Sequence, residues 1–281
     1  MTALCLLPSF VWEVSTKSKG KEDVKKYFSK SSLHNLFLST ITSTTDLFLW
    51  VYAMNYTSIS DSMLFQTSTP FICIIHMLLK HQLPQPVEIL GGIIAFLGVI
   101  ILSTMVDAQG SDLKLYGDFL ALISCILGYC WLRYNNYFMK RLNMGIFVYY
   151  FPYSVLSAVY CVACACLFEG IGFWELMSGF VMQQPLVVVM LGIGPGLFGL
   201  TLMTYCQKHV DLFVLSVVCT LEPLFASVVA AALGVRNEVT WWTLVGGAVL
   251  IFGNCITMYG NQRAKKSQEQ EETLLEKETA Q

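Results

Sequence analysis

Long apolar segments separated by short polar connections make up most of this chain. Eight of these segments are about 20 residues long, the length at which an α-helix crosses the hydrocarbon core of a bilayer. The pattern predicts membrane-spanning helices over residues 34–53, 58–79, 86–106, 115–138, 145–168, 184–205, 210–234 and 240–260. Runs of this length differ from the short alternating strands of a membrane β-barrel. The predicted fold class is therefore all-α, a polytopic membrane helical bundle with eight full spans.

One pattern of tyrosine, proline and glycine occurs twice along these segments. It consists of a tyrosine, a proline 18 residues later, then a glycine pair and a further glycine. The first copy is Tyr52, Pro70, Gly91, Gly92 and Gly98, and the second copy is Tyr205, Pro223, Gly246, Gly247 and Gly253. Each copy covers three consecutive spans, so the two copies cross the membrane in opposite directions. We expect an inverted repeat, the arrangement that many alternating-access transporters use.

Basic residues set the expected orientation. Of the 17 Lys and Arg residues, all except Lys114 and Arg236 fall on one side of the eight predicted spans. The positive-inside rule places that side, and with it both termini, in the cytosol. The predicted organisation is a stump of an incomplete membrane helix at 1–12, a cytosolic basic linker at 13–33, a transmembrane domain at 34–260 with repeat one at 34–106 and repeat two at 115–260, and a cytosolic charged tail at 261–281.

Composition excludes several classes of protein. Apolar residues make up 55% of the chain and charged residues 13%, against about 25% charged in soluble domains. The membrane topology accounts for the basic residues, so no nucleic-acid partner is expected. No phosphate-binding loop, Gly-x-Ser-x-Gly or His-Glu-x-x-His motif occurs, and an enzyme is not expected. Cys161, Cys164 and Cys166 have no nearby His or acidic residue, so neither a metal site nor a cofactor is predicted.

Polar side chains inside the apolar spans are the candidates for a substrate cavity. A carboxylate at mid-bilayer costs about 2.5–3.5 kcal/mol, so Asp46 and Glu222 are expected to face the bundle interior or water. Together they would suit a cation, a proton or the polar groups of a solute. A buried protonated acid is the alternative for Glu222, and a position near the interface is the alternative for Asp46. The other cavity candidates are Trp50, Gln66, Thr67, Tyr129, Tyr153 and Thr220.

Prolines and glycines carry a second set of predictions. Pro70, Pro195 and Pro223 are expected to kink their helices, and the carbonyls freed at a kink either line a cavity or serve packing alone. Gly91 and Gly98 are seven residues apart, as are Gly246 and Gly253. Each pair therefore lies on one helix face, where a neighbouring backbone can approach closely.

The duplicated pattern resembles the drug/metabolite transporter superfamily, and within it the EamA-like transporters. The residues that carry the resemblance are Tyr52 to Ser60, Thr69 to Phe71 and Gly91 to Gly98 in the first half, and Tyr205 to Asp211, Glu222 to Leu224 and Gly246 to Gly253 in the second. The similarity covers residues 34–260. It implies a ten-helix bundle of two five-helix inverted repeats around a central cavity. This chain is N-terminally short by that plan, and its eight spans would be helices three to ten.

The resemblance and the repeat together predict an integral membrane transporter of a small organic metabolite. It would work by alternating access without ATP hydrolysis, with proton coupling through Glu222 left open. No basic residue lies at mid-membrane, which favours a neutral or cationic solute over a strongly anionic one. A non-transporting membrane scaffold or a regulatory short variant is the alternative. An eight-helix chain is further expected to form a homo-oligomer if its cavity needs closing.

Overall fold

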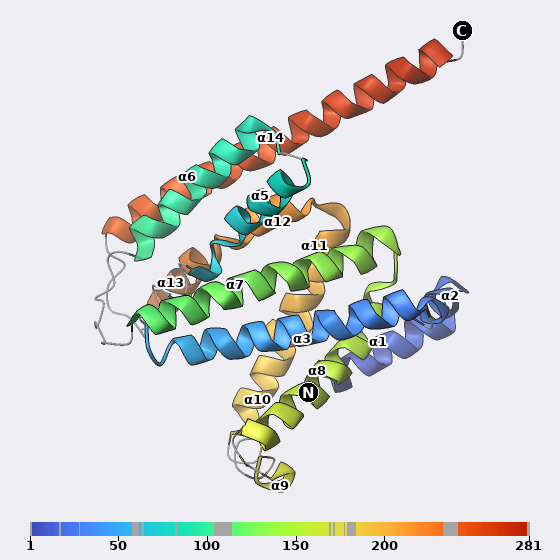
Figure 1. Ribbon diagram of the computed structural model, residues 1–281, viewed down its shortest axis with the longest axis vertical. Coiled ribbons are helices and arrows are strands. Elements are labelled where there is room, and N and C mark those ends of the chain that lie inside the picture. Colours follow the sequence, from blue (N-terminus) through green and yellow to red (C-terminus); the bar gives the residue numbers. More distant parts are fainter. Residues whose placement is uncertain are drawn as a thin grey trace. The chain divides into compact units, whose positions relative to one another are not determined.

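The computed structural model describes residues 2–16, 18–27, 29–57, 62, 65–81, 84–103, 114–168, 170, 172–176, 178, 184–232 and 241–279. These residues form helices, and no strand occurs among them (Figure 1). The prediction of an all-α protein is confirmed. The chain divides into two compact units, of which unit one is Met1–Phe48 with Leu127–Val210, and unit two is Leu49–Ile126 with Asp211–Gln281.

The helices follow one another along the chain with short connections. Those of unit one are α1 (Thr2–Thr16), α2 (Ser18–Lys26), η1 (Tyr137–Arg141), α8 (Ile146–Phe168), α9 (Phe173–Leu176), α10 (Pro185–Leu191), η3 (Gly192–Gly199) and α11 (Leu200–His209). Those of unit two are α5 (Thr69–Leu79), α6 (Pro86–Ser103), α12 (Leu212–Cys219), α13 (Glu222–Ala232) and α14 (Trp241–Thr279). The boundary between the units falls within α3 (Lys30–Ala53) and α7 (Lys114–Asn136).

Four helical stretches among the described residues are long and apolar enough to cross a membrane. They are Leu115–Arg141, Ile146–Leu167, Pro185–His209 and Leu244–Arg263. They coincide with four of the eight predicted spans. Helix α3 is also long, but the polar run from Ser39 to Asp46 lowers its hydropathy. Helix α5 is too short to count as a span.

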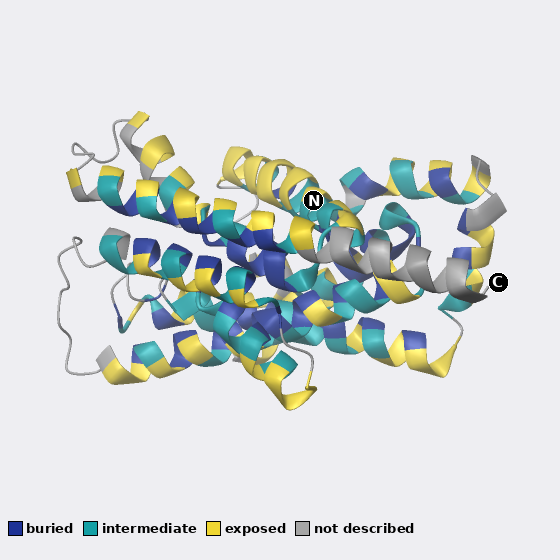
Figure 2. Cartoon of the chain, turned by 90° about the horizontal axis from the view of Figure 1, so that it is seen from above, coloured by how far each residue is buried: buried dark blue, intermediate teal, exposed yellow. Residues whose placement is uncertain are grey.

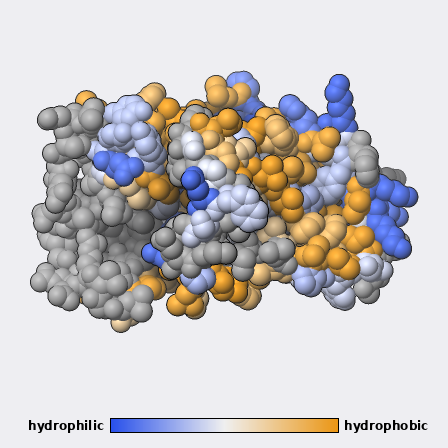
Figure 3. All heavy atoms as spheres, turned by 90° about the horizontal axis from the view of Figure 1, so that it is seen from below, coloured by the Kyte–Doolittle hydropathy of each residue, from blue (hydrophilic) through white to orange (hydrophobic). Residues whose placement is uncertain are grey.

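Many large apolar side chains lie on the surface. Leu79 is 76% exposed, Phe198 67% and Leu202 63%. Figure 3 shows such side chains, in orange, over much of one face. Buried and exposed positions alternate along the helices in Figure 2, so each helix turns only part of its surface to its neighbours. Exposed leucine and phenylalanine on this scale fit contact with lipid.

Helices α6 and α14 lie side by side in unit two (Figure 1). A methyl group on Gly91 would lie 2.8 Å from the carbonyl oxygen of Gly253, and one on Gly98 would lie 2.8 Å from that of Gly246. The residue number rises along one helix as it falls along the other, so the helices run antiparallel. Their backbones touch at the glycines, as small residues allow between membrane helices.

This contact exchanges equivalent positions of the duplicated pattern. Gly91 corresponds to Gly246 and Gly98 to Gly253, so the contact of Gly91 with Gly253 and that of Gly98 with Gly246 are copies of one another. The same holds for Gly98 against the amide of Leu250 and Gly253 against the amide of Ala95. The pairing of α6 with α14 therefore has a local two-fold symmetry.

The chain is interrupted before both prolines of the pattern. Pro70 is the second residue of α5, and Pro223 is the second residue of α13. Turn residues precede each helix, Thr67 and Ser68 in one case and Thr220 and Leu221 in the other. The prediction of a kink within a continuous helix is thus corrected at both places. Proline lacks an N–H, and the first turn of a helix is where that N–H is not needed.

The third proline lies within an irregular helical stretch. Pro195 is in η3, a π-helical segment that joins α10 to α11. Its ring removes a backbone donor, and four glycines of the same segment, Gly192, Gly194, Gly196 and Gly199, weaken regular α-helix further. A wider helical turn is one known way for a helix to absorb such a disruption.

Both ends of the chain are helical beyond the predicted spans. The predicted stump belongs to α1, which packs on α8. The predicted basic linker contains α2 and the start of α3. Helix α14 continues without interruption from the last predicted span into the predicted tail.

The glycine contact generates a first prediction. Gly98→Ala would bring a methyl group 2.6 Å from the amide nitrogen of Leu250, a backbone atom that cannot turn away. We expect the free energy of unfolding to fall by about 1–3 kcal/mol, as for overpacked cores. Thermal unfolding of purified protein in detergent micelles measures this loss.

Gly92→Ala is the matched control for that variant. The nearest atom to its added methyl group is a ring carbon of Phe213 at 3.4 Å, an ordinary contact. Equal unfolding temperatures for the two variants would contradict the close packing of α6 on α14.

Candidate functional site

The polar run of α3 faces hydroxyl groups of α8 within unit one. Four pairs meet in order along the two helices. The pairs are Ser39 with Tyr149 at 2.9 Å, Ser43 with Tyr153 at 2.5 Å, Thr44 with Ser157 at 2.8 Å and Thr45 with Tyr160 at 3.2 Å. Residue numbers rise together on both helices, so α3 and α8 run parallel. We call these eight residues the hydroxyl cluster.

Tyrosine rings of α8 stack beside these hydroxyls. The centroids of Tyr149 and Tyr153 are 5.8 Å apart, and those of Tyr150 and Tyr153 are 5.5 Å apart. Phe138 extends the stack, with its centroid 4.7 Å from that of Tyr149. All four side chains are at most 5% exposed. The result is a buried surface of aromatic faces edged by hydroxyl groups.

The direction of the hydrogen bonds follows from Asn135. The hydroxyl of Tyr149 donates its proton to the side-chain oxygen of Asn135, so Ser39 donates to Tyr149 in turn. The hydroxyl of Tyr153 donates to Ser43, and Ser43 donates to the carbonyl oxygen of Thr40. These chains of donors bring polar groups into the apolar interior with partners already in place.

Asp46 lies at the end of the polar run and is 9% exposed. A methyl group on Gly128 of α7 would lie 2.8 Å from a carboxylate oxygen of Asp46. Gly128 therefore makes room for the carboxylate. The sequence analysis named Asp46, Tyr129 and Tyr153 in this unit but not Gly128, whose signal was a glycine inside an otherwise regular span.

The other predicted cavity residues belong to unit two. The side-chain oxygen of Gln66 accepts a hydrogen bond from Ser124 at 3.2 Å. Thr220 is 1% exposed and donates to the carbonyl oxygen of Val217 at 2.6 Å. Thr67 is 8% exposed. The indole nitrogen of Trp50 is buried and has no hydrogen-bond partner among the described residues.

Glu222 was expected to face the bundle interior or water. Its side chain is exposed, and the residue begins helix α13. A carboxylate in the first turn of a helix is stabilised by the positive end of the helix dipole. In contrast, the side chain of Asp46 is only 9% exposed.

Gln207 was missed by the sequence analysis. It lies on α11 in unit one, is 1% exposed, and neither atom of its amide has a partner among the described residues. A buried amide without partners is costly, and such groups are more frequent where a ligand or water completes them. Its sequence signal was a polar amide just before Lys208 and His209, beyond the end of the predicted span 184–205.

No metal centre is visible in the described part of the chain, where no three His, Cys, Asp or Glu side chains gather to hold an ion. The arrangement can hold a solute by hydrogen bonds, aromatic contact and one carboxylate. These are interactions of binding.

Comparison with known proteins places the chain by its fold. No family model matches it, and no curated protein matches it. Among solved structures, 27 chains match. One of these, the crystal structure of a protein, superposes with a TM-score of 0.62 over 90% of this chain and 86% of its own length, at 15% sequence identity. Identity this low shows the fold alone. The apolar helices of the described residues indicate a helical membrane protein.

The hydroxyl cluster generates a second prediction. Tyr153→Phe removes the donor to Ser43, and Ser43→Ala removes the acceptor. We expect the two changes to be coupled by about 0.5–2 kcal/mol in the free energy of unfolding, because Tyr153 is buried and Ser43 is half-buried. A double-mutant cycle on unfolding in mixed micelles measures this coupling.

Thr45→Val with Tyr160→Phe provides the control cycle, since that pair is longer at 3.2 Å and Tyr160 is less buried than Tyr153. Its coupling energy should be smaller. If the Ser43 cycle shows no coupling, the short contact does not contribute to the fold.

Proposed function

We propose that this chain is an EamA-like transporter that moves a small organic metabolite across a membrane by alternating access, without ATP hydrolysis. The observation that carries the proposal is the contact between α6 and α14. There the first glycine of each pattern copy meets the last glycine of the other copy, about a local two-fold axis, on helices that run antiparallel. Two copies with opposite directions are what an inverted repeat requires.

The directions of two helix pairs support the eight-span plan. Helices α3 and α8 are the predicted spans one and five, and they run parallel. Helices α6 and α14 are the predicted spans three and eight, and they run antiparallel. Both results agree with spans that alternate in direction through the whole series. An even number of spans would leave both termini on one side, which the basic residues assign to the cytosol.

The interruptions before Pro70 and Pro223 give a second line of support. They occur at equivalent positions of the two copies, after Thr67-Ser68 and after Thr220-Leu221. Transporters with inverted repeats often bind their solute where paired helices are broken, because free backbone groups there can contact it. Because the helix break occurs at the equivalent position in both halves, we favour a role in solute binding over a coincidence.

The hydroxyl cluster, the tyrosine stack and Asp46 are the proposed recognition surface in unit one. Hydroxyl groups and aromatic faces suit a neutral or cationic organic solute, and the buried carboxylate suits a positive charge or a transported proton. We assign this role to Asp46 before Glu222, because Asp46 is enclosed and Glu222 is exposed. Gln207 joins the proposed set as a buried amide that a solute or water can complete.

Uptake into liposomes tests the function directly. Purified protein is reconstituted into liposomes, and the liposomes are loaded with an unlabelled mixture of amino acids, nucleosides, polyamines and sugars. Entry of each labelled compound is then followed in exchange and under a proton gradient. Saturable uptake of at least one compound above protein-free liposomes is expected. Folded protein that gives no uptake with any compound would favour a non-transporting membrane scaffold.

Asp46→Asn generates a third prediction. Loss of the buried charge should lower the rate of uptake by about tenfold or more, as expected when a charged hydrogen bond to a ligand is lost. The folded yield should change little, since Asn keeps the shape of the side chain. Initial rates of uptake at several external pH values measure the effect.

Glu222→Gln is the comparison variant, because it removes the other carboxylate of the predicted cavity from an exposed position. It should retain most of the uptake. A larger loss for Glu222→Gln than for Asp46→Asn would reverse the assignment of the two carboxylates.

A further inference from the structure

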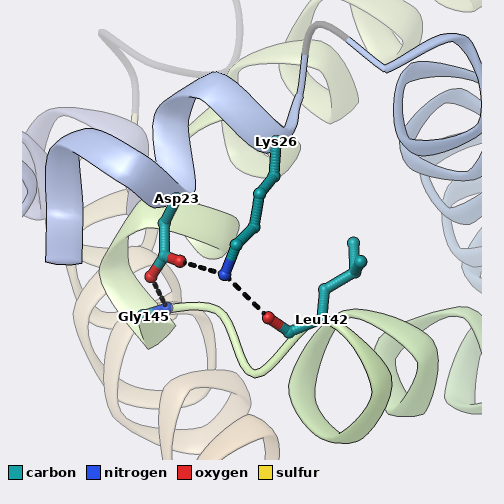
Figure 4. Close-up of polar contacts among 4 residues, drawn as sticks. All are labelled: Asp23, Lys26, Leu142 and Gly145. Atoms are coloured by element: carbon teal, nitrogen blue, oxygen red, sulfur yellow. Dashed lines mark hydrogen bonds and ion pairs between the residues drawn. The ribbon is translucent and has the colours of Figure 1, made fainter.

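Helix α2, which precedes α3, forms hydrogen bonds with the turn that joins η1 to α8. One carboxylate oxygen of Asp23 accepts a hydrogen bond from the backbone N–H of Gly145 at 2.9 Å. Its other oxygen pairs with the ammonium group of Lys26 at 2.6 Å. Lys26 also donates to the carbonyl oxygen of Leu142 at 2.9 Å. Figure 4 shows this arrangement, in which one ion pair joins both sides of the turn.

A second carboxylate meets the same helix end. One oxygen of Glu13, on α1, accepts hydrogen bonds from the backbone N–H groups of Phe147 at 3.1 Å and Val148 at 3.3 Å. Glu13 is 8% exposed and Asp23 is 1% exposed. Together they satisfy three of the N–H groups at the start of α8 that have no partner within the helix.

The charges have the sign that the helix ends require. Two carboxylates lie at the N-terminus of α8, where the helix dipole is positive. The ammonium group of Lys26 lies at the end of η1, where free carbonyl groups make the helix negative. An ordinary surface ion pair has no such preference for orientation. The direction of the Asp23–Lys26 pair therefore matters as well as its presence.

The contacts continue toward the start of α3. The hydroxyl of Tyr27 donates to the carbonyl oxygen of Val148 at 3.0 Å. Burial raises the pKa of Tyr27 well above its usual value, and the charge of Asp23 raises this pKa further, so the hydroxyl stays a neutral donor. Helix α3 begins three residues later, at Lys30. The starts of α3 and α8 are thus tied to one another.

We propose that Asp23, Lys26 and Glu13 form a positioning clasp that sets the register of α3 against α8. The hydroxyl cluster needs this register, because its four pairs match only when the helices keep their present offset. The role of the clasp in solute recognition rests on the proposed function. Its effect on register does not, and can be measured without transport.

Disulfide formation reports the register. The hydroxyl oxygens of Thr44 and Ser157 are 2.8 Å apart, so cysteines at these positions lie within reach of a disulfide. For the in-register pair, all native cysteines of the chain are replaced by serine, and Thr44→Cys and Ser157→Cys are introduced. For the out-of-register pair, Cys161 is the one native cysteine that is kept, and Thr44→Cys is introduced. Cys161 lies four residues further along α8 than position 157. Copper phenanthroline oxidation followed by a gel-shift measures both yields.

Asp23→Asn and Lys26→Met are introduced into both reporter backgrounds. Each should lower the ratio of in-register to out-of-register disulfide by about threefold or more, as expected from the loss of a charged helix cap. Glu22→Gln, an exposed carboxylate beside Asp23, is the matched control and should leave the ratio unchanged. A general loss of stability would lower both yields together, so an unchanged ratio overturns the proposal.

Exchange of the two charges separates the clasp from a simple ion pair. Asp23→Lys with Lys26→Asp keeps a pair of opposite charges but presents each to the wrong helix end. The ratio should stay low, and its recovery to the parent value would overturn the proposal. Size-exclusion profiles select folded variants, and Glu13→Gln supplies the same test if either Asp23 variant fails to fold.

Uptake assays then distinguish this proposal from the transport proposal. A changed disulfide ratio in a protein that moves no solute would support the clasp and refute the transporter. An unchanged ratio in a protein that transports normally would do the reverse.

Discussion

In lipid, every polar group must find its partner inside the protein, and this constraint shapes the described structure. Between Ser39 and Asp46, helix α3 carries seven polar residues in eight positions, with Ile41 as the exception, in what would otherwise be an apolar span. In water such a run would have no preferred partner. Here hydroxyl groups of α8 form hydrogen bonds with four of its side chains, and the missing side chain of Gly128 leaves room for the carboxylate of Asp46. The polar run thereby specifies which helix lies beside α3, and in which direction.

The same constraint acts on the ends and breaks of helices. The first N–H groups of α8 are capped by carboxylates from a segment more than a hundred residues earlier in the chain. The prolines of the repeated pattern stand at the first turns of α5 and α13, where a missing N–H leaves nothing unsatisfied. Helices α6 and α14 associate in another way, by direct contact of their backbones at the glycines. Polar pairing in unit one and close glycine packing in unit two are two solutions to association without a hydrophobic driving force.

Much of the fold could be predicted because it depends on local pattern. Apolar length predicted the helices, and four of the expected spans have matching helices long enough to cross a membrane. The candidate site was less accessible. Asp46 and Tyr153 were named as separate polar residues in spans, but their neighbours Ser43, Asn135 and Gly128 were not, because no spacing along the chain reveals which faces of α3, α7 and α8 meet. For Glu222 the apolar run left the bundle interior and water as alternatives, and its place at the start of α13 could not be read from that run.

The sequence by itself determined the helical membrane class, the repeated pattern and the short list of polar residues that lipid would not tolerate. These follow from hydropathy and spacing, which each segment carries alone. The tertiary structure decided the antiparallel glycine contact, the parallel pairing of α3 with α8, and the capping of α8 by Glu13 and Asp23. It also showed that residues 13–27, basic in composition, use two buried acids to hold a helix end. Such contacts join residues far apart in the chain, so only the packed arrangement of helices can specify them.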